Sequence, residues 1–73
     1  MPLIQVRLIQ GVFTSKQKQE IITKLTDAMV SVEGEHMRPV TWVLLEELNS
    51  GEWGIGGKPM TTEAVKALAV GKT

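Results

Sequence analysis

Cysteine is absent from this chain of 73 residues. No disulfide framework, zinc–thiolate site or thiol nucleophile can therefore form, and the composition fits a reducing compartment. A chain of this length buries only about 60 % of the surface that its unfolded form exposes, so its own hydrophobic core is marginal. Because disulfides cannot add stability, we expect association between copies of the chain to do so.

An excess of charge of either sign is also absent. Eight basic and eight acidic residues give a formal net charge of +0, with no basic block to follow nucleic-acid phosphates or bind a membrane surface. No segment reaches the length of a membrane span, and the first residues lack the pattern of a signal peptide. The sequence predicts a single soluble, cytoplasmic domain over residues 1–73, with no nucleic-acid or membrane partner.

The first half of the chain predicts a strand followed by a long helix. Residues 3–9 read L-I-Q-V-R-L-I, a run rich in β-branched and apolar side chains that is ended by Gly11. Thr14 and Gln17 have the T-x-x-Q spacing of a capping box, and apolar residues then recur at three- and four-residue intervals. We expect a helix over residues 15–32, ended by Gly34.

A second strand is predicted over residues 40–48, after a turn over residues 34–39. Its sequence, V-T-W-V-L-L-E-E-L, is apolar on both faces, which is typical of a strand that is covered twice. Strand, helix and strand then form a βαβ unit with parallel strands and a right-handed crossover. One helix covers only one face of this pair, so we expect the other face to contact another subunit.

A glycine-rich hairpin and a short helix are predicted in the last third of the chain. Residues 51–57 read G-E-W-G-I-G-G, and we expect positive φ angles at Gly54, Gly56 and Gly57 in a hairpin from which Trp53 projects. The spacing fits neither G-x-x-x-x-G-K-[ST] nor G-x-G-x-x-G, so no phosphate-binding loop is predicted. A helix over residues 62–70 follows and ends at Gly71.

Pro2 is the leading candidate for a catalytic group. Methionine before a small residue is normally removed, and removal of Met1 makes the nitrogen of Pro2 a secondary amine. An α-amine titrates near about 8 in model peptides, and apolar surroundings lower its pKa further. The pyrrolidine ring limits the motion of the nitrogen, so Pro2 can act as a well-aimed general base.

These features together resemble the 4-oxalocrotonate tautomerase family of the tautomerase superfamily. The resemblance covers residues 2–57 and rests on the initial proline, the glycine that ends the first strand, the crossover helix and the W-G-I-G-G hairpin. It implies an α/β (α+β) fold of the tautomerase/MIF-like type, with a βαβ protomer, a C-terminal hairpin and short helix, dimers with four-stranded sheets and a homohexamer. It also implies a catalytic proline at a subunit interface, a small carboxylic acid as substrate, and no cofactor or metal.

The resemblance identifies Pro2 as the catalytic base and Trp53 as the aromatic wall of the pocket. The chain departs from the family at two carboxylate-binding arginines, because Val12 and Phe13 stand after the first strand and Trp42 stands in the second. Valine and tryptophan cannot form the planar two-point pair that an arginine forms with a carboxylate. We therefore expect Phe13, Trp42 and Trp53 to bind an apolar enol or α-keto monoacid rather than a dicarboxylate.

Two other arginines are the remaining cationic candidates. Arg38, four residues before Trp42, is the nearest replacement for the missing arginines, since apolar pockets usually need a polar anchor. An equally weighted alternative is that Arg38 is simply a solvated residue in the turn ahead of Pro39. Arg7 lies five residues after Pro2 and points to the opposite face of the strand, where we expect a surface or intersubunit ion pair.

Two alternatives to a tautomerase stay open. The first is a related hydratase or dehalogenase that acts on an unsaturated acid with protonated Pro2 as the acid, and it needs a water-activating carboxylate that no motif here places. The second is an oligomeric homologue that keeps the fold without the chemistry. If Met1 is retained, the nitrogen of Pro2 is an amide and cannot act as a base.

Overall fold

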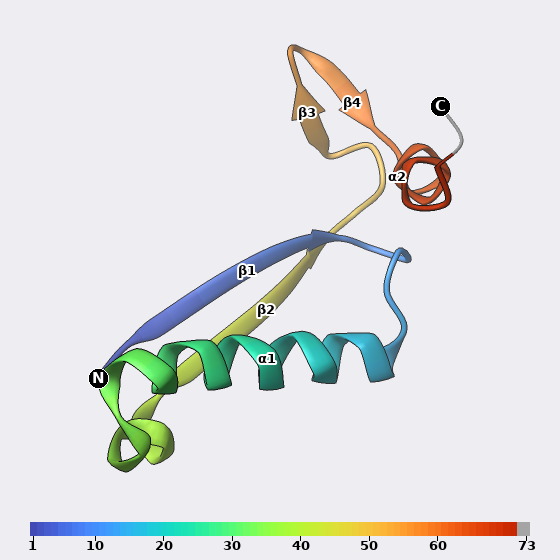
Figure 1. Ribbon diagram of the computed structural model, residues 1–73. Helices are drawn as coiled ribbons and strands as arrows, with labels where there is room; N and C mark the ends of the chain where they lie inside the picture. Colours follow the sequence, from blue (N-terminus) through green and yellow to red (C-terminus); the bar gives the residue numbers. More distant parts are fainter. Residues whose placement is uncertain (72–73) are drawn as a thin grey trace.

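The chain folds as a βαβ unit followed by a hairpin and a short helix (Figure 1). The computed structural model describes residues 1–71. In chain order the elements are β1 (Leu3–Ile9), α1 (Ser15–Glu33), the 3-10 helix η1 (Glu35–Val40), β2 (Trp42–Leu48), β3 (Trp53–Ile55), β4 (Lys58–Met60) and α2 (Thr62–Ala69). This mixed α+β architecture agrees with the predicted fold class.

β1 and β2 pair in parallel, as the sequence predicts, and Leu3 lies beside Trp42 at the start of the pair. The long helix α1 runs along one face of the two strands (Figure 1). Lys18 of α1 forms an ion pair with Glu47 of β2, with 2.8 Å between the nitrogen and the carboxylate oxygen. Because side chains alternate between the two faces of a strand, the face that carries Glu47 is the one covered by α1.

The predicted capping box begins α1. The hydroxyl oxygen of Thr14 accepts from the N–H of Gln17 at 3.1 Å, and the side-chain oxygen of Gln17 accepts from the N–H of Thr14 at 2.9 Å. At the other end, Gly34 has a φ of 105° and its N–H donates to the carbonyl of Val30. The helix therefore begins at the predicted residue and ends at Glu33, one residue later than predicted.

The connection from α1 to β2 differs from the prediction. Residues 35–40 form η1, and β2 begins at Trp42, so the predicted start of the second strand at Val40 is wrong by two residues. Pro39 has no N–H to donate to a strand ladder. The N–H of Thr41 instead donates to the carbonyl of Arg38 at 3.2 Å, which closes the last turn of η1 immediately before the strand.

The antiparallel hairpin of β3 and β4 turns at Gly56 and Gly57. Their φ angles of 59° and 84° are the positive values that glycine accommodates without steric cost. The predicted positive φ at Gly54 is wrong, because Gly54 lies in extended β3 beside Pro59 of β4. The hairpin also extends beyond the predicted segment, through β4 to Met60.

The short helix α2 follows the hairpin almost as predicted. The hydroxyl of Thr61 accepts from the N–H of Ala64 at 3.1 Å and caps the first turn. The helix ends at Ala69, one residue before the predicted end, and Gly71 beyond it has a φ of 76°. Within residues 1–71, no helix is both long and apolar enough to cross a bilayer.

The protomer has almost no core of its own. Ile9 and Val30, which are 5 % and 4 % exposed, are the only buried hydrophobic residues in the described part of the chain. The accessible surface is 5438 Å², about 1,000 Å² more than a folded monomer of 8.0 kDa usually has. The Cα radius of gyration is 14.9 Å, against about 11 Å for a compact domain of this length.

Three of the exposed large hydrophobic side chains lie on the side of β1 and β2 opposite α1, which we call the open face. The open face comprises Leu3, Gln5, Arg7 and Ile9 of β1 with Trp42, Leu44, Glu46 and Leu48 of β2. Leu3, Trp42 and Leu44 are 53 %, 51 % and 40 % exposed there. Apolar side chains that are contiguous and exposed indicate a surface that another molecule covers.

We predict that the protein is a stable homo-oligomer in solution, and the family resemblance indicates a hexamer. Covering the open face would bury apolar surface that the single protomer leaves in water, and burial contributes about 25 cal/mol per Å². Light scattering coupled to size-exclusion chromatography should therefore give a mass several times the 8.0 kDa of the protomer. A folded monomer at micromolar concentration would contradict this prediction.

Candidate functional site

Pro2 lies at the start of the sheet with its nitrogen outside the strand ladder. Its carbonyl accepts from the N–H of Trp42 at 3.1 Å, so the backbone after the nitrogen is held by β2. Met1, which acylates the nitrogen, is 78 % exposed. Removing Met1 would therefore release the amine of Pro2 and take away little packing.

Trp42 lies beside this end of β1, on the open face. Its register partner is Leu3, and its side chain is 51 % exposed. The ladder hydrogen bond to Pro2 fixes the backbone of both residues at the same end of the sheet. Two of the predicted site residues, Pro2 and Trp42, are therefore brought together within one protomer.

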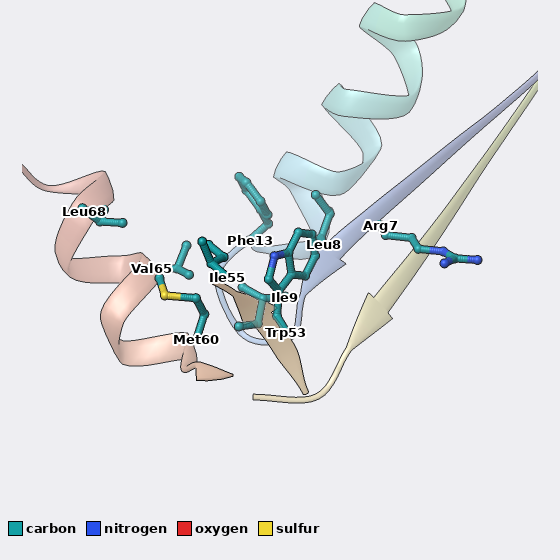
Figure 2. A pocket seen from close by; sticks show the side chains of 9 residues that line it. All are labelled: Arg7, Leu8, Ile9, Phe13, Trp53, Ile55, Met60, Val65 and Leu68. Atoms are coloured by element: carbon teal, nitrogen blue, oxygen red, sulfur yellow. The ribbon is translucent and has the colours of Figure 1, made fainter. Parts of the chain in front are cut away.

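Phe13 and Trp53 lie together at the opposite end of β1. They line an apolar cavity of about 280 Å³ between the end of β1, the hairpin and α2. The remaining lining residues are Arg7, Leu8, Ile9, Ile55, Met60, Val65 and Leu68. Figure 2 shows α2 presenting Val65 and Leu68 toward this space, whereas the guanidinium of Arg7 points away from the aromatic side chains.

The position of α2 beside this cavity depends on a close approach at Gly11. The φ of Gly11 is 87°, and a Cβ at this position would lie 3.1 Å from the Cγ2 of Thr62. The hydroxyl of Thr62 donates to the carbonyl of Gln10, and its N–H donates to the hydroxyl of Ser50 at 2.9 Å. These contacts fix the first residue of α2 against the end of β1 and so place the wall of the cavity.

The predicted site is thus divided between the two ends of one protomer. β1 has seven residues, which at about 3.3 Å per residue span about 20 Å. Pro2 and Trp42 lie at one end of this strand, and Phe13 and Trp53 lie at the other (Figure 1). No single protomer can therefore place the nitrogen of Pro2 in the aromatic cavity.

Arg38 lies near the end of the sheet that carries Pro2, and its guanidinium is bound by two carboxylates. Its Nη1 is 2.8 Å from Asp27 of α1, and its Nε is 2.7 Å from Glu35. The hydrogen bond from Arg38 lowers the pKa of Glu35, and the two carboxylates raise the pKa of Arg38 above its ordinary value. A substrate carboxylate would have to compete with both partners, so the role of Arg38 as an anchor stays a prediction.

Sequence reasoning missed much of the cavity wall. Ile55, Val65 and Leu68 come from the predicted hairpin and helix, which the sequence does not place at a site, and Met60 comes from β4, beyond the predicted hairpin. The three-residue spacing of Val65 and Leu68 indicates that they share one helix face. Spacing alone does not say which surface that face meets.

Comparisons with known proteins point to one family. A family model described as tautomerase enzyme matches residues 2–63. A probable tautomerase of Ralstonia nicotianae is 41 % identical over 59 residues, which cover 81 % of each chain. A 2-hydroxymuconate tautomerase of Pseudomonas putida is 37 % identical over 57 residues, 78 % of this chain and 87 % of that protein.

Comparison with solved structures indicates the same family. The crystal structure of an apo unfused 4-oxalocrotonate tautomerase superposes with a TM-score of 0.71 at 32 % identity. The match covers 88 % of this chain and 98 % of that one. The two proteins are therefore similar in sequence as well as in backbone structure.

We predict that Arg38→Ala lowers the melting temperature more than Lys24→Ala. Lys24 pairs with Glu20 on the outer surface of α1 and is the matched control, whereas Arg38 joins α1 to η1 and separates two carboxylates. The hydrogen bond from Arg38 lowers the pKa of Glu35 in the folded protein. The ion pair therefore stabilises the folded protein at pH values above the ordinary pKa of glutamate. That contribution is lost as the pH falls through the lowered value.

Thermal unfolding followed by circular dichroism over a pH series would measure both effects. The difference in melting temperature between wild type and Arg38→Ala should be largest near neutral pH and should become smaller in acid. An Arg38→Ala protein as stable as Lys24→Ala at neutral pH would show that the two ion pairs do not hold η1.

Proposed function

The chain belongs to the tautomerase family and is a tautomerase-type isomerase, and we propose that the amine of Pro2 is its general base. The family match begins at Pro2, and the fold leaves the nitrogen of that residue outside the backbone ladder. A secondary amine at this position needs neither a cofactor nor a metal to move a proton. The proposal requires that Met1 is removed in the mature protein.

The main support for an active site shared between protomers is that the predicted site residues lie at the two ends of β1. Phe13 and Trp53 form an apolar cavity whose lining residues include no carboxylate, imidazole or amine that could act as a base, and Pro2 lies about 20 Å away along the strand. We propose that the cavity of one protomer receives the Pro2 end of another, in a homohexamer. Each protomer would then contribute to two sites.

In the proposed reaction the neutral amine accepts the hydroxyl proton of the enol as the carbonyl forms. The resulting ammonium then delivers a proton to the carbon at the far end of the enol system, which regenerates the amine. The net reaction moves one proton from the enol oxygen to carbon and shifts the double bonds, and no σ bond between heavy atoms forms or breaks. Positioning a base for such transfers contributes typically 10²–10⁴-fold in rate.

The apolar walls would prepare Pro2 for this role. Leu8, Phe13 and Trp53 keep water away from whatever enters the cavity. Removing water disfavours the charged ammonium, so we expect the pKa of the Pro2 amine to be lowered toward neutrality. More of the amine is then in the neutral form that accepts a proton.

The composition of the site favours an enol or α-keto acid with one carboxylate and an apolar or aromatic group. Val12 and Trp42 stand where the family resemblance places arginines, and Arg38 is already paired with two carboxylates. The residues that line the cavity include no carboxylate, so nothing there favours the activation of water that a hydratase or dehalogenase needs. Phe13, Trp42 and Trp53 would contact the apolar end of the substrate.

We predict that Pro2→Ala lowers the rate of tautomerisation by orders of magnitude and leaves the oligomer intact. Alanine keeps an amine at the N-terminus but loses the ring that fixes the nitrogen and the secondary amine itself. Spectroscopic assay of an enol acid, with light scattering on the same sample, tests both parts. Intact-mass measurement must first show that Met1 is absent from both proteins, and equal rates in them would refute the role of Pro2.

We also predict that kcat/KM is higher for an aromatic monocarboxylate enol than for a dicarboxylate enol. An anion that loses charge-assisted hydrogen bonds on entering an apolar site is bound less well by about 1.5–3 kcal/mol for each bond. A panel of enols with one carboxylate, two carboxylates or none measures this preference. A dicarboxylate enol as the best substrate would contradict it.

The same panel tests Arg38 as a carboxylate anchor. If Arg38 binds the acid, Arg38→Ala should raise KM for the acids and spare the neutral ketones. A change of equal size for acids and neutral compounds would assign Arg38 to the support of η1 instead.

A further inference from the structure

α2 supplies a part of the cavity wall that lies outside the family match. The model of the tautomerase family matches residues 2–63, whereas Val65 and Leu68, which line the cavity, come after these residues. Because they are three residues apart, they lie on one face of α2, and Figure 2 shows both side chains directed toward the cavity. This wall is therefore not specified by the residues that match the family model.

α2 is fixed against the end of β1 by its first residue. The hydroxyl of Thr62 donates to the carbonyl of Gln10, and its N–H donates to the hydroxyl of Ser50. At about 1.5 Å per residue, Leu68 lies about 4.5 Å farther along the helix from this contact than Val65 does. Val65 is half-buried, whereas Leu68 is 55 % exposed. The cavity thus has an inner part beside Val65 and an outer part, open to solvent, beside Leu68.

The cavity suits an apolar group better than water. Within the described part of the chain, Arg7 is the only charged residue that lines it, and the guanidinium of Arg7 points away from the aromatic side chains. A bound water needs two to four polar partners, whereas an apolar cavity of about 150 Å³ stays dry and binds benzene. The volume of about 280 Å³ therefore has room for an aromatic ring and for a further group beyond it.

We propose that Val65 and Leu68 determine the size of the apolar group that the enzyme accepts on its substrate. The role of α2 rests on the proposed function, in which Phe13 and Trp53 contact the apolar end of an enol acid. A single ring in the inner part contacts Val65, and a second, fused ring extends to Leu68. Covering the exposed side chain of Leu68 removes apolar surface from water, which favours the larger group.

Rates for three enols that differ only in this group test the proposal. The enols of α-keto acids that carry a methyl, a phenyl or a naphthyl group share one reacting centre, so kcat/KM for the larger two is divided by that for the methyl compound. We expect Val65→Phe to lower both ratios by about 10-fold or more, because the added ring fills the inner part and small changes in an apolar pocket alter discrimination by roughly 10–200-fold. Leu68→Ala should lower the naphthyl ratio several-fold and the phenyl ratio by less.

Val70→Ala is the matched control. Val70 directly follows α2, is 69 % exposed and is not among the residues that line the cavity, so both ratios should equal those of the wild type. Unchanged ratios in Val65→Phe and Leu68→Ala, or the same changes in Val70→Ala, would overturn the proposal. An altered mass in light scattering with wild-type ratios would assign α2 to a subunit contact and would also overturn it.

A second variant covers the case in which Val65→Phe does not fold. Val65→Thr keeps the shape of the side chain and places a hydroxyl on the apolar wall. It should lower both ratios by a smaller factor than Val65→Phe, with circular dichroism like that of the wild type. Wild-type ratios in a folded Val65→Thr protein would count against the contact.

Binding without reaction separates this inference from the proposed role of Pro2. Saturated carboxylic acids with the same three groups have no enol, and isothermal titration calorimetry measures their Kd in the wild type, Val65→Phe, Leu68→Ala and Pro2→Ala. We expect the affinities to depend on group size as the rates do, in Pro2→Ala as in the wild type. Affinities that follow this order beside an undiminished tautomerisation rate in Pro2→Ala would refute the base and support the wall. Affinities that Val65→Phe and Leu68→Ala do not change, beside a large loss of rate in Pro2→Ala, would refute the wall alone.

Discussion

One helix has to cover a two-stranded sheet that is apolar on both faces, and the rest of the structure follows from this constraint. α1 covers the face that carries Glu47 and is held there at its first turns by Lys18. The open face keeps Leu3, Trp42 and Leu44 in water. Because the single protomer buries so little apolar surface, we expect the stable unit to include more than one chain.

The same constraint links assembly to chemistry. A parallel pair of strands joined by one helix puts the start of β1 and the end of β1 at opposite ends of the sheet (Figure 1). Pro2, which we propose as the base, lies at the first end, and the apolar cavity lies at the second. If the site forms between copies, a protein that dissociates loses both its stability and the surroundings of its base.

Apolar surroundings are also what makes an amine useful near neutral pH. Phe13 and Trp53 replace water around the cavity by aromatic surface, and this disfavours the charged form of any amine that enters. The same surroundings bind a second carboxylate poorly, since the arginine nearest to Trp42 in the sequence is already paired with Asp27 and Glu35. In the proposed function, a lowered pKa of the Pro2 amine and a preference for a single carboxylate would therefore both follow from these apolar surroundings.

Features that depend only on neighbouring residues could be predicted from the amino-acid sequence. Thr14 and Gln17 cap α1 because a capping box needs only residues three apart, and Gly56 and Gly57 set the turn because glycine tolerates positive φ. Such patterns predicted every strand and helix of the βαβ unit, but not η1 at Pro39 or the continuation of the hairpin through β4.

Which of these features lie in contact depends on the fold of the whole chain. The contact of Thr62 with Gln10, which places the cavity wall, joins residues 52 positions apart, and that of Arg38 with Asp27 spans 11. Such contacts depend on the path of the whole chain, which local spacing does not specify. The separation of Pro2 from Phe13 and Trp53 also follows from the path of the chain. These residues belong to one predicted site, but β1 runs from Pro2 at one end of the sheet to the aromatic cavity at the other.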